Sequence, residues 1–319
     1  MRSATGGWRT PLLVAGCALL LVLGGSLWAR SVLEPGWGPF ARAGAARAAS
    51  MAPTAPAPQP LVARPPTESP PARTGMAATA VTAAEAAAHD GTELGVAVLD
   101  RVTGELAVGD RGTEPFYTAS LSKLVVAVDV LDRHRLEGLP VTETDVDLIR
   151  RALGPSDDDA MNALWSGFDG AGAAGRLSKR AGLENTSAPE DPSQWGEMAM
   201  PATDMVRVWH YILDDVPEEE RELLVSAMDR SPAEAADGFD QQYGLEAVPD
   251  GTSGHPDVVA KQGWMCCFGA QFYLHSAGLV GTDNRFVVAL MSRMRREPGW
   301  EAARQELDSV ADAAVRALR

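Results

Sequence analysis

The stretch Ser120-Leu121-Ser122-Lys123 decides how the rest of this sequence is interpreted. It opens an apolar segment, Ser120–His134, that is long enough for about four helical turns. A spacing of three residues places the Ser120 hydroxyl and the Lys123 amine on one helix face. A serine becomes a nucleophile when an adjacent base takes its proton, and a buried lysine can be that base. Ser122 adjoins Lys123 and points elsewhere, so Ser120 is the predicted nucleophile, although a capping serine before a surface lysine has the same pattern.

The use of lysine in this chain supports the interpretation. Of 28 lysine and arginine residues, only Lys123, Lys179 and Lys261 are lysines. Where arginine is the usual cation, a lysine indicates a position that needs an amine able to lose its proton. Two of the three lysines stand in candidate motifs, so those motifs deserve chemical interpretation.

Two further motifs follow along the chain. Ser156-Asp157-Asp158 precedes a helical pattern, and Lys261-Gln262-Gly263-Trp264 opens the first of three strand-like runs. The predicted strands are 94–100, 258–267, 270–280 and 285–292. Residues 101–105 turn the chain from the first of these into a further strand. The predicted helices are 76–89, 120–134, 159–165, 202–213, 218–228 and 300–318. Strands at both ends that bracket helices predict an α/β domain whose sheet combines both ends of the chain.

In this order the three motifs resemble S-x-x-K, S-D-N and K-T-G of the serine β-lactamase and penicillin-binding protein family, most closely its class A branch. The resemblance spans about residues 93–318, and Asn162 and Met200-Pro201-Ala202 also fit it. It implies an α/β (α+β) fold of the β-lactamase/transpeptidase type. In that fold an antiparallel sheet of N- and C-terminal strands is flanked by helices, with a mostly helical middle subdomain.

The resemblance also implies roles for the catalytic residues. Ser120 would be the acylated nucleophile, and Lys123 its proton acceptor or the orienter of one. Ser156, helped by Lys261, would pass a proton to the leaving nitrogen. The backbone N–H groups of Ser120 and Trp264 would form the oxyanion hole.

The implied substrate-binding residues are Asp158, Gln262, Gly263 and Trp264, with Lys261 and Gln262 binding the substrate carboxylate. Three departures from the family pattern bear on activity. Asp158 replaces an asparagine whose amide donates to the substrate, which an ionised carboxylate cannot do. Gln262 replaces threonine or serine. No E-x-x-L-N lies between Trp165 and Met200, and Glu184 is the remaining candidate there for a deacylating base.

Other functions are disfavoured. A net charge of −15 argues against a nucleic-acid groove. The five histidines show no H-E-x-x-H spacing, and Gly251-Thr252-Ser253-Gly254-His255 departs from G-x-S-x-G at its last position. The run Asp157-Asp158-Asp159 is expected to be an acidic helix start rather than a cation loop. No metal and no cofactor are therefore expected.

Two adjacent cysteines, Cys266 and Cys267, fall in a predicted strand. Neighbouring Cα atoms are about 3.8 Å apart, too close for a relaxed bridge, and strand side chains alternate between faces. We therefore expect no relaxed bridge between them and core packing for one of the two, with a redox role as the alternative.

The N-terminal part predicts a membrane-tethered protein. Residues 1–33 contain an apolar run, 11–28, which favours an uncleaved anchor over a cleaved signal peptide and a secreted protein. The lipobox-like Val14-Ala15-Gly16-Cys17 is discounted because most of the apolar run follows Cys17. Residues 34–75 form an Ala/Pro-rich linker, and 76–319 the predicted β-lactamase-like domain. The domain is expected to be extracytoplasmic.

Two functions remain open from the sequence. The first is a serine hydrolase or acyltransferase that acts through a Ser-Lys acyl-enzyme on β-lactams or D-Ala-D-Ala-type cell-wall peptides. The second is a catalytically weak or inactive domain that binds a wall fragment or a protein partner. The set Ser120, Lys123, Ser156 and Lys261 favours the first, and Asp158 with the missing glutamate favours the second.

Overall fold

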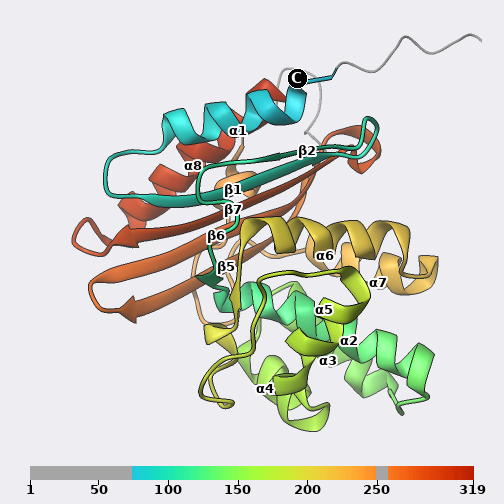
Figure 1. The fold of residues 1–319 in the computed structure, drawn as a ribbon. Coiled ribbons are helices and arrows are strands. Elements are labelled where there is room, and N and C mark those ends of the chain that lie inside the picture. The colour runs from blue at the N-terminus through green and yellow to red at the C-terminus, as the bar shows by residue number, and fades with distance from the viewer. Residues whose placement is uncertain (1–73, 249–257) are drawn as a thin grey trace, which may run out of the picture. The chain divides into compact units, whose positions relative to one another are not determined.

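A five-stranded antiparallel sheet lies between two layers of helices in the computed structural model, which describes residues 74–248 and 258–319 (Figure 1). The neighbouring strands are, in order, β2 (Glu105–Val108), β1 (Glu93–Asp100), β7 (Phe286–Arg295), β6 (Gln271–Val280) and β5 (Val258–Phe268). Strand β1 from the N-terminal part pairs with β7 from the C-terminal part. The predicted sheet of N- and C-terminal strands is confirmed.

The central strand β7 is buried on both faces. Val287 and Ala289 belong to the core beneath the larger helical layer, whereas Val288 and Leu290 belong to the core on the opposite face. Successive side chains of a strand point to opposite faces. An unbroken apolar run is therefore what this central position requires.

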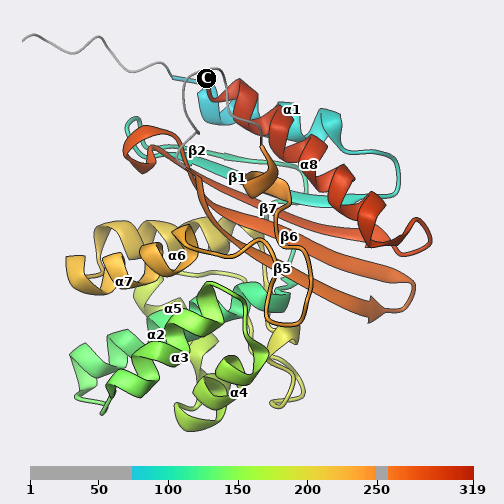
Figure 2. The ribbon, with the colours of Figure 1, turned by 180° about the vertical axis from the view of Figure 1, so that it is seen from behind.

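Helices α1 (Met76–Ala87) and α8 (Gly299–Ala317) cover one face of the sheet and pack against each other, as Figures 1 and 2 show. The buried side of α1 carries Ala77, Ala80 and Ala84, at spacings of three and four residues. These small side chains lie on one face of the helix and allow a close approach to α8.

The other face is covered by the helical part of the domain, with α6 (Ala202–Asp214) directly against β1 and β7. The other helices here are α2 (Ser122–Glu137), α3 (Glu143–Leu153), α4 (Asp158–Gly167), α5 (Ala173–Ala181) and α7 (Glu218–Asp229). Strand β3 (Phe116–Tyr117), which pairs with β4 (Ala199–Met200), lies just before Ser120, the predicted nucleophile. The sequence patterns predicted α2, α4, α6 and α7, but not α3 and α5.

Of the two expectations for the adjacent cysteines, core packing for one is confirmed, because Cys267 packs against the core formed with α1 and α8, but the absence of a bridge is not. The structure joins Cys266 and Cys267 in a disulfide near the end of β5. Strict alternation of side chains holds only in a regular ladder, and the pairing of β5 with β6 shifts register between Cys266 and Phe268. At this bulge the two side chains are no longer directed to opposite faces.

The predicted anchor (1–33) lies outside the described residues, as does the linker (34–75) except for its last two positions. Within residues 74–248 and 258–319, no helix combines the length and the apolar character needed to cross a bilayer.

Candidate active site

The predicted nucleophile lies in a short 3₁₀ turn, Ala119–Leu121, immediately before α2. Ala119 has a φ of 48°, in the left-handed region, and the Ser122 hydroxyl donates to its carbonyl oxygen at 2.8 Å. Such a conformation persists only where the surroundings hold it. Ser120 itself is buried, and Ser122 supports the turn.

Strand β5 packs directly on this turn. A Cβ atom at Gly263 would lie 2.9 Å from the Thr118 carbonyl oxygen and 3.3 Å from the Leu121 nitrogen. Only glycine allows two backbones to approach this closely. The third motif therefore meets the first through the backbone, and the Tyr243 hydroxyl fixes the strand by donating to the Gly263 carbonyl oxygen at 3.1 Å.

Lys123 lies at the centre of the site and is completely buried. Its Nζ is 3.0 Å from the Ser120 Oγ and 3.1 Å from the Ser156 Oγ. It also donates to the Ser156 carbonyl oxygen and to the Asp158 Oδ1, each at 2.6 Å. The helical spacing that was read from the sequence thus brings the amine onto the predicted nucleophile.

Lys261 approaches the same serine from β5. Its Nζ is 2.9 Å from the Ser156 Oγ and 3.0 Å from the Gln262 carbonyl oxygen. Ser156 has a φ of 56°, and its carbonyl oxygen and its hydroxyl both accept from Lys123. The four predicted catalytic residues form one connected path, Ser120–Lys123–Ser156–Lys261.

Burial lowers the pKa of both amines, because removal from water disfavours the charged form. For Lys123, the carboxylates of Asp158, Asp237 and Asp157 act against this lowering of its pKa. For Lys261, the charge of Lys123 adds to burial, and its pKa lies well below the ordinary value. A lysine with a lowered pKa is a better proton acceptor near neutral pH.

Asp158, the first residue of α4, makes an ion pair with Lys123. The Asp158 side chain is 57% exposed, whereas that of Lys123 is fully buried. The preceding residue, Asp157, is the N-cap of α4 and accepts from the backbone N–H groups of Asp159 and Ala160. The departure noted in the sequence therefore places a carboxylate against the predicted base.

The other predicted binding residues are placed differently. Gln262 is buried, and its side-chain amide donates to the Tyr243 carbonyl oxygen at 3.2 Å. The Trp264 indole donates to Asp237 Oδ2 at 3.1 Å and stacks on Phe239, with ring centroids 4.7 Å apart. In this arrangement the Gln262 amide is already bonded to the backbone, and the Trp264 ring lies 5.8 Å from the Lys261 Nζ.

The structure also places residues at the site that the sequence did not single out. The Trp195 ring lies over Lys123, with its centroid 4.9 Å from Nζ, and its indole donates to Asn162 Oδ1 at 2.9 Å. Glu184 instead forms an ion pair with Arg207 at 2.8 Å. The segment where a deacylating base was sought therefore contributes an aromatic ring to Lys123.

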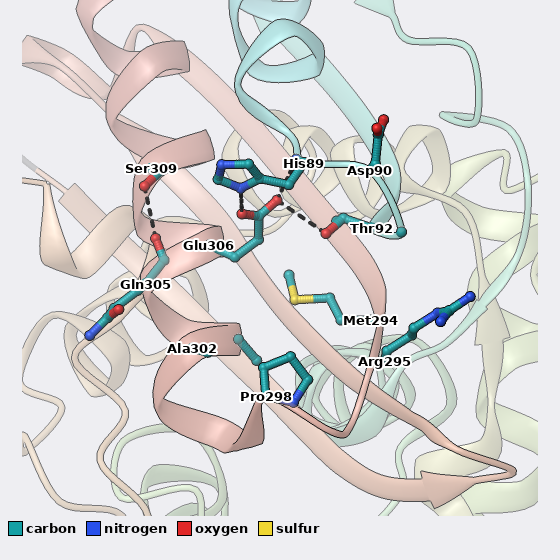
Figure 3. A pocket seen from close by; sticks show the side chains of 12 residues that line it. His89, Asp90, Thr92, Met294, Arg295, Pro298, Ala302, Gln305, Glu306 and Ser309 are labelled. Atoms are coloured by element: carbon teal, nitrogen blue, oxygen red, sulfur yellow. Dashed lines mark hydrogen bonds and ion pairs between the residues drawn. The ribbon is translucent and has the colours of Figure 1, made fainter.

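A separate hollow of about 460 Å³ lies between the end of α1, the end of β7 and α8 (Figure 3). His89 and Glu306 line it and are hydrogen-bonded to each other, and this carboxylate raises the pKa of His89. Thr92 also donates to Glu306. None of the residues that line this hollow belongs to the predicted site. Within the described ranges, no three or more His, Cys, Asp or Glu side chains are grouped as metal ligands would be.

No family model matches the sequence. Proteins of Mycobacterium bovis and Mycobacterium tuberculosis that carry the name "Putative lipoprotein LppW" are 32% identical to this chain over 213 residues. The aligned region is 66% of this chain and 66% of each relative. The match therefore spans just under two thirds of the relatives' length.

Solved structures are similar at lower identity. The extended-spectrum β-lactamase TLA-1 matches with a TM-score of 0.62 and 13% identity, over 76% of this chain and 99% of that one. PBP-A matches with a TM-score of 0.59 and 17% identity, over 78% and 98%. The chain thus has the fold of the class A β-lactamases and PBP-A.

Proposed function

We propose that this domain is a serine acyltransferase or hydrolase that forms an acyl-enzyme at Ser120 with β-lactams and D-Ala-D-Ala-type cell-wall peptides. The observation that carries the proposal is the Lys123 Nζ, which lies 3.0 Å from the Ser120 Oγ and 3.1 Å from the Ser156 Oγ. One buried amine can therefore take a proton from the nucleophile and pass it on.

Acylation then proceeds in a balanced sequence. The Ser120 Oγ attacks the amide carbonyl carbon, a C–O bond forms, and the hydroxyl proton moves to neutral Lys123. The C–N bond breaks, and Ser156 delivers a proton to the leaving nitrogen while it is replenished from Lys123. Lys261 stabilises negative charge on the substrate from the β5 side. The close packing of Gly263 on the nucleophile turn supports an oxyanion hole built from the Ser120 and Trp264 N–H groups.

We further propose that the acyl-enzyme is long-lived. Within segment 183–200, whose residues are all described, no carboxylate hydrogen-bonds to Ser120 or Lys123. Trp195 lies over the amine instead, and Glu184 pairs with Arg207. Without a carboxylate to activate water from that side, hydrolysis of the ester should be slow. The expected behaviour is that of a penicillin-binding protein rather than of a rapidly hydrolysing β-lactamase.

One observation favours the second function, a weak or inactive domain that binds a wall fragment or a protein partner. The ion pair with Asp158 stabilises the protonated form of Lys123, in which the amine cannot accept a proton. If this form persists when substrate is bound, the site binds its ligand without acylation.

We place the domain on the extracytoplasmic side of the membrane, tethered through its N-terminal segment. The relatives' name, which describes a lipoprotein, supports this location. It also makes Cys17 worth testing as a lipid attachment site, alongside the predicted uncleaved anchor. Incorporation of labelled palmitate that is lost in Cys17→Ala would identify a lipoprotein, whereas unchanged membrane association without label would favour the anchor.

The proposal is tested by intact-mass spectrometry of the full-length protein after incubation with benzylpenicillin. Ring opening leaves the whole molecule attached, so the expected mass increase is that of one benzylpenicillin. Ser120→Ala should abolish the adduct, and Ser122→Ala should retain it. An adduct that survives in Ser120→Ala but is lost in Ser122→Ala would show that Ser122, and not Ser120, is acylated. No adduct on the wild type would favour the binding domain.

A further inference from the structure

We propose that Asp158 selects acyl donors that carry a protonated amine on the acyl side chain, beside the reacting carbonyl group. This inference rests on the proposed acylation of Ser120 and names a substrate class for it. The natural substrate would then be a wall peptide with a cationic substituent close to the scissile bond.

The position of Asp158 relative to the nucleophile carries the first step. Asp158 Oδ1 and the Ser120 Oγ are bonded to the same Lys123 nitrogen, at 2.6 and 3.0 Å. The carboxylate oxygen therefore lies less than about 6 Å from the nucleophilic oxygen. An acyl group attached to Ser120 must place the substituents next to its carbonyl within reach of Asp158.

Asp158 also has a carboxylate oxygen available to bind a ligand. Its side chain is 57% exposed, and among the described residues only Oδ1 has a hydrogen-bond donor. An ionised carboxylate accepts several hydrogen bonds through its two oxygens. Oδ2 is therefore free to accept from a ligand ammonium while Oδ1 stays on Lys123.

The other two carboxylates that act on Lys123 lack this capacity. Asp157 uses one oxygen to cap α4 and the other to bind Arg151. Asp237 accepts from the Phe239 backbone N–H on one oxygen and from Trp264 on the other. Of the three, only Asp158 presents an unbonded oxygen, so selectivity is assigned to this residue.

A cationic side chain would also promote the reaction. A ligand ammonium on Oδ2 competes with Lys123 for the negative charge, so the carboxylate holds the lysine proton less strongly. Lys123 can then become neutral and accept the proton of Ser120. A neutral acyl donor leaves the Asp158–Lys123 pair intact and should react more slowly.

The test compares ampicillin with benzylpenicillin, whose acyl side chains differ by one α-amino group. Acylation rates are measured by intact mass on the full-length protein at about pH 6, where an α-amino group is protonated. We expect the wild type to react about fivefold faster with ampicillin, a modest factor for a half-exposed charge. In Asp158→Asn the ratio should fall to about one.

Asp159→Asn is the matched control, because Asp159 is the next residue of α4, is exposed, and loses the same charge. Its ratio should stay at about five. Equal rates for the two penicillins on the wild type, or an unchanged ratio in Asp158→Asn, would overturn the inference and leave the proposed acylation standing. Failure of both penicillins to form an adduct would instead overturn the proposed function, and the inference with it.

Discussion

The two buried lysines of the site stand in contrasting surroundings. On the α2–α4 side, Lys123 is paired with a carboxylate and covered by Trp195. On the β5 side, Lys261 donates to the Ser156 hydroxyl and the Gln262 carbonyl, and within the described residues no carboxylate bonds to it. One side therefore holds an ion pair, and the other an amine with no carboxylate bonded to it among the described residues. Under the proposed function, this difference favours proton transfer on the Lys123 side and attraction of a substrate anion on the Lys261 side.

The largest expected effect comes from replacing the paired lysine. Lys123→Arg should reduce acylation by benzylpenicillin as thoroughly as Lys123→Ala, by about a thousandfold, because arginine keeps the charge but accepts no proton near neutral pH. Stopped-flow or quenched intact-mass measurements give the rates. Lys179→Arg, on an exposed position of α5, is the control. An active Lys123→Arg enzyme would mean that Lys123 contributes only its charge and is not the proton acceptor.

Replacing Asp158, the other member of the ion pair, should increase the acylation rate rather than reduce it. Asp158→Asn removes a charge that raises the pKa of Lys123, so the rise of acylation rate with pH should move to lower pH. Asp157 at the start of α4, Asp237 and Lys261 still face the amine in the variant. With benzylpenicillin we expect a gain of about tenfold to a hundredfold near neutral pH, since each 1.4 kcal/mol is tenfold. Equal rates for variant and wild type from about pH 5 to 8 would place Asp158 outside the reacting site.

Replacement of Lys261, which has no bonded carboxylate among the described residues, should change the free energy of unfolding. Lys261→Met keeps much of the volume and removes a buried charge, so the free energy of unfolding at neutral pH should rise by about 1–2 kcal/mol while acylation falls. Because the folded pKa of Lys261 lies below its ordinary 10.5, the wild type gains stability as pH rises through that window.

The difference between Lys261→Met and wild type should therefore shrink as the pH approaches 10.5. Urea unfolding of both proteins at neutral and alkaline pH measures it. A Met variant that is less stable at every pH would mean that the bonds of Lys261 to Ser156 and Gln262 outweigh its burial.

The smallest effect concerns the aromatic cover. A ring over an ammonium stabilises the charged form by at least about 0.5–1 kcal/mol. Trp195→Leu should therefore shift the pH dependence of acylation slightly to lower pH and change the rate about threefold. Trp195→Phe keeps a ring and loses only the bond to Asn162, so it should stay closer to wild type. Identical pH profiles of acylation for the Leu and Phe variants would show that the Trp195 ring does not affect the charge state of Lys123.

Local spacing made much of this molecule predictable. The i to i+3 relation of Ser120 and Lys123 survives folding because both residues lie on one continuous backbone stretch. Strand-like runs at both ends of the chain predicted a sheet of N- and C-terminal strands, and the resemblance carried by the three motifs implied that this sheet is antiparallel. Helix α3 went unpredicted although it carries a readable signal, a capping box in which Thr142 and Asp145 cap each other's backbone.

The remaining site features depend on approach between distant segments. The bond from Asp158 to Lys123 joins residues 35 positions apart, and Trp195 reaches the amine from a loop with no regular pattern. No periodicity specifies such contacts. The bridge between Cys266 and Cys267 was not predicted for a related reason, because strict alternation does not hold where the strand changes register.

The pairing of β1 with β7 has a consequence for how this protein is made. Glu93 of β1 lies opposite Arg293 of β7, and this central strand is also the last strand in the chain, so it is the last to leave the ribosome. Sheets that join such distant residues form slowly, and their unpaired strand edges are prone to aggregation until the last strand is added. During synthesis, α2 and Ser120 emerge long before β5 and β7 can enclose them. A chain of this design therefore depends on protection of its first strands until the last one is available.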